Sequence, residues 1–202
     1  CALSSAASTG SSTDDNSTYW LKDFNREHYL GMMFGQGESF KDFYLKLSKG
    51  RFLARGDVSD WVTVAHPESY YQSATGDEDG VSMKNFIQDS ANAWYDSQVA
   101  AGKSDTQIQD YLKSFDVWDR YDYDGDGNFN EPDGYIDHFQ IVHAGEGEET
   151  GGGAQGTDAI WSHRSYTNTA GLGVQGPAFN PLGGIRVGGS NYWVGDYTVE
   201  PE

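Results

Sequence analysis

An acidic, glycine-containing stretch at residues 122–133 holds the side chains whose types and spacing best suit a chemical role. Aspartates occupy loop positions 1, 3 and 5, and a hard cation such as calcium binds six to eight oxygen ligands at short range. Gly127 falls at position 6, where the loop must turn sharply and a residue free to adopt a positive φ is favoured. The spacing therefore predicts a calcium site formed by Asp122, Asp124, Asp126, Asn128 and Asp133.

The later positions of this loop differ from the usual calcium pattern. Asn128 would offer its backbone carbonyl oxygen, and Asn130 could hold a water molecule. Asp133 stands at position 12, where a glutamate is usual; it can still chelate through both oxygens, although its side chain is shorter. A helix is expected before the loop and a strand after it, so the ligands resemble those of an EF-hand but the surroundings do not.

The alternative interpretation is an acidic surface turn, because Asp and Gly are also common turn residues. Three aspartates at alternate positions would repel one another without a cation, which favours the calcium site.

Composition limits the remaining possibilities. The chain has 202 residues, which is long enough for one domain with a sizeable core. Aromatic residues make up 14% of it, so this core can be built from large rings. Its net charge of −18 argues against nucleic acid and against anionic membrane surfaces as partners. The lone cysteine, Cys1, allows no internal disulfide, and we expect it to be either lipidated or merely the point where the sequence begins. We expect no membrane span, because no segment approaches the ~20 apolar residues required, and we recognise no signal peptide.

The residue pattern in the first third of the chain predicts a polar tail followed by two short helices. Residues 1–17 are small and polar, and we expect them to form a disordered tail or linker. Asn25 and Ser39 are predicted N-caps of helices that end near Phe34 and Gly50. The second helix has an apolar face at helical spacing. Residues 51–64 are predicted to form a β-hairpin that turns near residues 56–57.

The rest of the chain alternates between helical and strand patterns, which indicates an α+β fold. Residues 81–99 have helical apolar periodicity, and Ser104 with Gln107 predicts a capping box for the next helix. Residues 134–144 are predicted to form a central strand, followed by a surface loop at 145–156. Further strands are expected at residues 159–163 and 192–199.

Other catalytic patterns are absent from the sequence. It contains no Gly-x-Ser-x-Gly elbow. None of its five histidines belongs to a His-Glu-x-x-His helix, which a zinc peptidase needs to aim two imidazoles at one metal ion. A pair of carboxylates for glycoside hydrolysis stays open, since the relevant separation is spatial.

Several segments resemble the immune inhibitor A family of secreted bacterial metallopeptidases. The densest similarity is DRYDYDGDGNFNEPDGYIDH at residues 119–138, and it continues through QIVHAG at 140–145, GGGAQG at 151–156 and IWSHR at 160–164. FKDFY at 40–44, GDVSDW at 56–61 and GDYTVEPE at 195–202 also fit the family.

The resemblance implies a zincin-like fold, in which a twisted mixed sheet carries packed helices. Residues 18–202 would form the upper part of the catalytic domain, truncated before the catalytic zinc helix, so this chain would supply no catalytic residue. The first strand of the family domain would precede Cys1. The resemblance further implies a secreted endopeptidase of protein or peptide substrates, with calcium bound by this chain and zinc in the full-length enzyme. We expect the strand that pairs with the substrate to be residues 160–163.

Two other functions remain open from the sequence. One is a non-catalytic, calcium-binding extracellular module for adhesion or carbohydrate contact. The other is a hydrolase that uses paired carboxylates. The sequence leaves the oligomeric state open.

Overall fold

The computed structural model describes residues 2–6, 24–72, 81–153, 155–167, 176–177, 180 and 182–202. Its helices are α1 (Arg26–Phe34), α2 (Phe40–Leu47), α3 (Glu68–Tyr71), α4 (Val81–Ala100) and α5 (Asp105–Lys113), with short 3₁₀ helices η1 (Glu148–Thr150) and η2 (Gly156–Asp158). Its strands are β1 (Ala2–Ala6), β2 (Val62–Thr63), β3 (Phe139–His143), β4 (His163–Tyr166), β5 (Ile185–Arg186), β6 (Trp193–Val194) and β7 (Asp196–Pro201). No helix in the described part of the chain is long and apolar enough to cross a bilayer.

A five-stranded mixed sheet in the order β2-β1-β3-β7-β4 organises these elements. Its first four strands are parallel, and β4 pairs antiparallel with β7 at one edge, with Ser165 opposite Tyr197. β5 and β6 form a separate antiparallel pair. The α+β prediction and the central position of the strand after the acidic loop are confirmed.

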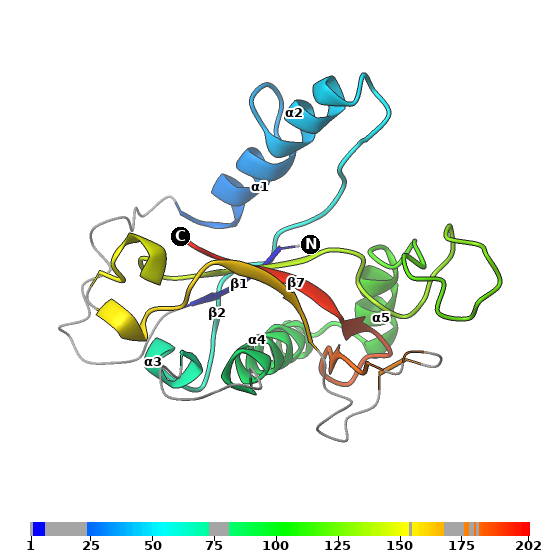
Figure 1. The fold of residues 1–202 in the computed structure, drawn as a ribbon. Coiled ribbons are helices and arrows are strands. Elements are labelled where there is room, and N and C mark those ends of the chain that lie inside the picture. Colours follow the sequence, from blue (N-terminus) through cyan, green and yellow to red (C-terminus); the bar gives the residue numbers. More distant parts are fainter. Residues whose placement is uncertain are drawn as a thin grey trace.

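Helices cover the two faces of this sheet unequally (Figure 1). Helices α3, α4 and α5 lie on one face, whereas α1 and α2 project from the other. The main core fills the first face, where Ile141 and Val199 pack with Phe86 and Ile87 of α4. Val142 points to the opposite face and packs near Tyr29 of α1. Successive strand residues alternate between faces, so one short strand serves both layers.

Most of the predicted helices are confirmed together with their caps. Asn25 accepts from the backbone N–H of His28, and Ser39 accepts from that of Asp42. Ser104 and Gln107 form a reciprocal capping box at the start of α5. These contacts are local in sequence, so the residue pattern alone was sufficient to predict them.

Two expectations for the first third of the chain are wrong. The first is the disordered tail at 1–17: Ala2–Ala6 form β1 between β2 and β3, and residues 7–17 lie outside the described residues. The second is the hairpin at 51–64, of which only β2 is a strand, paired in parallel with β1. The Arg26 side chain donates to the Val58 carbonyl oxygen (2.6 Å) and to the Asp57 carboxylate (2.7 Å). These bonds hold the segment that was expected to form the hairpin turn against α1.

The last two predicted strands have different boundaries from those expected. β4 begins at His163, because the backbone N–H of buried Ile160 donates to the Glu68 carboxylate (2.8 Å) and holds the preceding residues as a loop. The strand at 192–199 is divided at Gly195, because β6 pairs with β5 while β7 joins the main sheet.

Candidate metal centre

The acidic loop joins α5 to β3, and the carboxylates of buried Asp116 and half-buried Asp137 hold the two ends of the loop together. Asp116 accepts from the backbone N–H groups of Asp133 (3.0 Å) and Gly134 (3.1 Å). Asp137 accepts from those of Val117 and Trp118, each at 3.2 Å. Asp116, before the loop, therefore holds the end of the loop, and Asp137, after the loop, holds its beginning. The segment between them is fixed at both ends.

Side-chain oxygens also shape the tip of the loop. The Asp122 carboxylate accepts from the N–H of Gly127 (2.9 Å), and the Asp126 carboxylate accepts from that of Asn128 (2.7 Å). Gly125 and Gly127 have φ of 75° and 82°, so the positive φ predicted for Gly127 is confirmed. Glycine adopts this conformation at little cost, which allows one short segment to turn its carboxylates inward.

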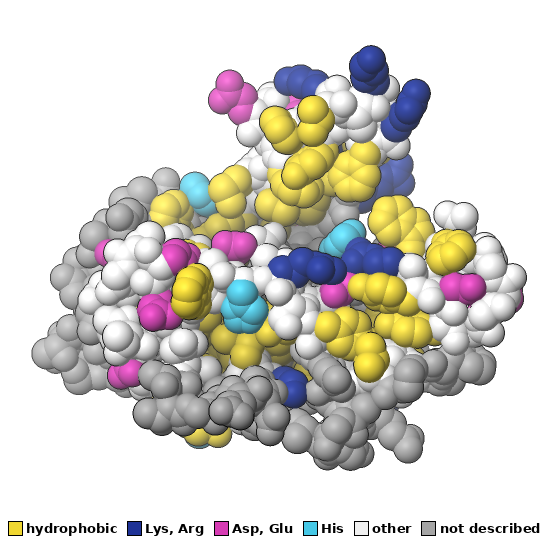
Figure 2. All heavy atoms as spheres, viewed as in Figure 1, with side chains coloured by type: hydrophobic (Ala, Val, Ile, Leu, Met, Phe, Trp, Pro, Cys, Tyr) yellow, Lys and Arg dark blue, Asp and Glu magenta, His cyan; other side chains and the backbone are white. Residues whose placement is uncertain are grey.

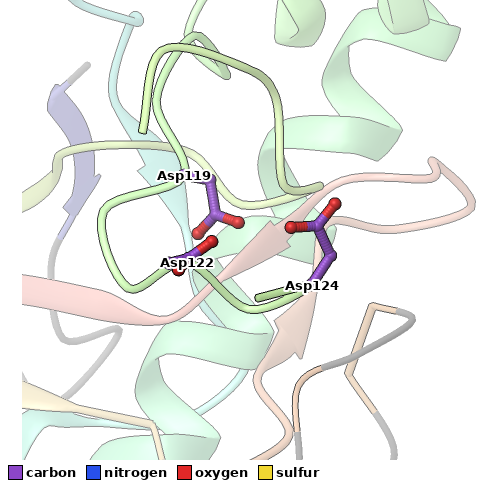
Figure 3. A group of neighbouring side chains, drawn as sticks. All are labelled: Asp119, Asp122 and Asp124. Carbon is purple, nitrogen blue, oxygen red and sulfur yellow. The ribbon is translucent and has the colours of Figure 1, made fainter. Parts of the chain in front are cut away.

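Four aspartates and one glutamate form two overlapping acidic groups. Asp119, Asp122 and Asp124 each place one carboxylate oxygen within 4.8 Å of the others (Figure 3). Asp124, Asp126 and Glu131 form the second group by the same measure. Asp124 belongs to both, so the two groups are continuous.

Three of the five predicted ligands belong to these groups, Asp122 with Asp124 in the first and Asp124 with Asp126 in the second. Asn128 and Asp133 lie in neither group. The Asn128 side-chain amide donates to Glu131 (2.7 Å), and the Asp133 carboxylate accepts from the N–H of Tyr135 (2.8 Å). Their predicted roles as ligands stay predictions.

Asp119 and Glu131 are the acidic residues that the sequence reasoning missed. Asp119 is only 3% exposed, and its Oδ2 accepts from the N–H of Tyr123 (2.8 Å). Its Oδ1 is buried and has no hydrogen-bond partner in the described part of the chain. A buried carboxylate oxygen without a partner is costly unless a cation compensates its charge. The all-oxygen donor set therefore fits calcium, which prefers oxygen ligands.

A spacing signal for Asp119 was present in the sequence. It stands three residues before Asp122, outside the usual loop count. One turn places two such residues side by side, and here the N–H of Asp122 lies 3.4 Å from the Asp119 carbonyl oxygen.

Burial and mutual repulsion raise the pKa of several carboxyl groups at this loop. Burial, followed by the nearby charges of Asp116, Asp119 and Asp137, raises the pKa of Asp133 from 3.8 to about 7. Burial likewise raises the pKa values of Asp116 and Asp137. Desolvation and the charges of Asp126 and Asp124 raise that of Glu131. Because these pKa values are raised, the carboxyl groups at the loop ionise less readily when no cation is bound.

We expect the metal-free protein to lose stability as the pH rises. A folded-state pKa above the unfolded value stabilises the fold fully below the unfolded pKa, and this stabilisation is lost as the pH rises through the folded pKa. For Asp133 the window runs from 3.8 to about 7, and its contribution changes by at most about 1.4 kcal/mol per pH unit. Urea unfolding in chelator at several pH values should show this fall, and Asp133→Asn should flatten it. A slope unchanged by this substitution would contradict the assignment.

A network at Asp196 connects the loop to the edge of the sheet. The Asp196 carboxylate accepts from Arg120 Nη1 (2.8 Å), from the Tyr121 hydroxyl (2.8 Å) and from Arg164 Nη2 (2.9 Å). Arg120 and Tyr121 directly precede the acidic tip, whereas Arg164 lies on β4 and Asp196 on β7. The position of the loop and that of the edge strand are therefore coupled.

The outer side of β4 presents backbone groups that do not face β7. The N–H of Thr167 donates to the Gly195 carbonyl oxygen (2.9 Å). This bond shows which residues of β4 direct their N–H and C=O groups toward β7. Alternate residues face the partner strand, so Ser165 faces β7, and the backbone groups of Arg164 and Tyr166 point to the other side of β4, an open edge as far as the described strands go. At one end, the Glu149 carboxylate accepts from the N–H of Ser162 (3.2 Å), so the open stretch starts after that residue.

No histidine among the described residues belongs to either acidic group. His143 is buried at the end of β3, with its Nδ1 3.3 Å from the Glu68 carboxylate. Burial lowers the pKa of His143 to about 4 and raises that of Glu68 to about 7. Both groups are therefore expected to be largely neutral between these two pKa values, and Glu68 ionises as the pH approaches 7.

Comparisons with known proteins give a consistent result. The family model described as "Immune inhibitor A peptidase M6, catalytic domain" matches residues 6–202. Immune inhibitor A of Bacillus thuringiensis subsp. alesti is 36% identical over 197 residues, which cover 91% of this chain and 26% of that protein. The pre-pro-metalloprotease PrtV of Vibrio cholerae serotype O1 (strain M66-2) is 32% identical over 189 residues, which cover 88% of this chain and 19% of that protein. The chain thus spans about a quarter or less of the length of these curated relatives.

Proposed function

The chain belongs to the immune inhibitor A family of M6 peptidases, and from this premise we propose that it is the sheet-bearing part of a secreted, zinc-dependent and calcium-stabilised endopeptidase. The observation that carries the proposal is the family match over residues 6–202. The mixed sheet, with its antiparallel strand at an edge, supports the zincin-like architecture that the resemblance implies, although β1 lies before residue 18.

The residues that the structure describes form no cluster typical of a zinc site. The sequence contains no His-Glu-x-x-His pattern, and the acidic groups offer only carboxylate oxygens, whereas zinc sites use mainly histidine and cysteine. Zinc, when bound in the full-length enzyme, would supply an activated water and polarise the peptide carbonyl group. We place its ligands after Glu202, as the family resemblance implies, and assign this chain the tasks of substrate binding and support.

We assign substrate binding to β4 rather than to residues 160–163. An extended peptide can add to an exposed sheet edge through main-chain hydrogen bonds, which give affinity without much sequence selection. Arg164 and Tyr166 direct their backbone groups to that edge, whereas the N–H groups of Ile160 and Ser162 are occupied by Glu68 and Glu149. The substrate strand would therefore begin to pair beyond Ser162.

We assign the acidic loop to calcium, with Asp119, Asp122, Asp124, Asp126 and Glu131 as the side-chain ligands. The orphaned oxygen of Asp119 supports this assignment. Bound calcium would rigidify the loop, and the Asp196 network would transmit this rigidity to β4.

Casein hydrolysis by the full-length protein tests the proposed function. We expect cleavage that a zinc chelator abolishes and added zinc restores, with stoichiometric zinc in the purified protein. The 202-residue chain alone should be inactive. A zinc-free full-length protein without peptidase activity would favour the calcium-binding module or the paired-carboxylate hydrolase. Zinc-dependent cleavage by the isolated chain would show that the ligands have been misplaced.

A further inference from the structure

Helix α2 turns its apolar face outward. Four side chains at positions i, i+3, i+4 and i+7 share this face, and α2 buries none of its residues. Phe43 and Leu47 are 58% and 66% exposed. The Phe52 ring packs beside Tyr44, with ring centroids 5.9 Å apart, and extends the face. We call this surface the apolar tip; its exposed members are Phe40, Phe43, Tyr44, Leu47, Phe52 and Leu53.

The apolar tip lies on the segment richest in positive charge. Five of the 13 basic residues fall within residues 41–55: Lys41, Lys46, Lys49, Arg51 and Arg55. Asp42 is the one acid in this segment, whose net charge is therefore +4, while the remainder of the chain carries −22. Figure 2 shows basic side chains around hydrophobic ones on the part that projects from the body.

Two of these basic side chains donate to backbone carbonyl oxygens, Lys41 to that of Phe34 (2.6 Å) and Lys46 to that of Gly37 (3.4 Å). Within the described part of the chain, none of the five lies in a salt bridge with an acidic group. At 100° per residue, Lys41 and Lys46 flank the apolar stripe of α2 on opposite sides. Asp42 points away from the stripe and accepts from the N–H of Gly37 (2.6 Å).

We propose that the apolar tip docks the protein on an anionic phospholipid surface. An interfacial helix has an apolar face that enters the boundary between headgroups and acyl chains, with lysine and arginine beside it at the level of the phosphates. The cationic segment fits such a surface in charge, and its projection from the body (Figure 1) lets it reach a bilayer ahead of the acidic remainder. A projecting tip suits a bilayer better than a peptide, which would require a groove.

This proposal revises the inference drawn from net charge. The total of −18 combines a cationic segment of +4 with a remainder of −22. Electrostatic attraction between exposed charges is screened within about 8 Å at physiological ionic strength, so the charges nearest the bilayer dominate. The acidic body would be repelled, which would orient the protein with α2 toward the lipid.

Vesicle co-sedimentation of the full-length protein tests the proposal. Vesicles of phosphatidylcholine alone are compared with vesicles that also contain phosphatidylserine, in chelator so that calcium cannot bridge carboxylates to lipid. We expect binding to the mixed vesicles only, and weaker binding at high salt. Lys46→Gln with Lys49→Asn should reduce partitioning roughly twentyfold, since each cation near an anionic surface contributes about fivefold. Leu47→Ser should also reduce it.

Matched controls separate the tip from general effects of charge and hydrophobicity. Lys113→Gln removes an exposed cation, and Val99→Ser an exposed apolar side chain, both outside the tip. Neither should change partitioning, and all variants should melt at similar temperatures. Failure of the native full-length protein to bind the mixed vesicles would overturn the proposal, as would equal losses in the controls. Light scattering that shows the tip variants dissociating an oligomer, with no change in lipid binding, would assign the tip to a protein interface instead.

Discussion

Chelation of calcium is expected to lower the melting temperature by roughly 5–10 °C, and Asp119→Asn is expected to remove most of that difference. A ligand at a hundred times its Kd stabilises the folded state by about 2.7 kcal/mol, and about 1 kcal/mol shifts the melting temperature of a chain of this size by roughly 2–4 °C. Asp119 supplies a buried carboxylate oxygen that no described group satisfies. Differential scanning fluorimetry across a calcium titration would measure the shift, which should grow with calcium concentration.

Without calcium, Asp119→Asn should leave the melting temperature unchanged or raise it. Asp119→Asn removes one negative charge from a group in which three carboxylates lie within 4.8 Å of one another, so in chelator the variant should melt at or above the temperature of the native protein. Asp124→Ala should abolish the calcium response, since Asp124 belongs to both acidic groups. Asp96→Asn, an exposed carboxylate on α4, should respond to calcium like the native protein. A melting curve indifferent to chelator would exclude a stabilising site at this loop.

Arg164→Pro is expected to reduce kcat/KM of the full-length enzyme on peptides roughly tenfold while leaving the fold intact. Proline has no N–H group, and at this position the missing group faces the open edge of β4 rather than β7. One lost hydrogen bond contributes about 1 kcal/mol, and the ring also displaces the approaching substrate strand. Steady-state kinetics on a fluorogenic peptide, together with melting curves, would measure both effects.

Two neighbouring variants make this experiment decisive. Arg164→Ala also loses the ion pair with Asp196 but keeps the N–H group, so it should retain most of the activity. Ser165→Pro removes an N–H group that faces β7, so it should destabilise the sheet. If Arg164→Pro cleaves peptides as well as Arg164→Ala does, the substrate strand does not pair with β4.

The features that the sequence predicted correctly depend on neighbours along the chain. The caps at Asn25, Ser39 and Ser104 each involve a residue three positions later, so they form wherever a helix starts. The turn at Gly127 and the proximity of Asp124 to Asp122 and to Asp126 likewise follow from alternation within a few residues. Family membership was also visible in short motifs, because the densest of them lie in this same loop.

The features that it missed depend on contacts between distant segments. β1 is a strand because β2 and β3 flank it, although its own sequence, Ala-Leu-Ser-Ser-Ala, lacks a strand pattern. Asp119 joins the acidic group through a turn outside the loop count, and its burial depends on the surrounding fold. Helical periodicity identified the apolar face of α2, but only the packing of α2 against α1 decided that this face points outward. Periodicity in the sequence predicts which residues share one face of a helix. Tertiary contacts determine whether that face is buried or exposed.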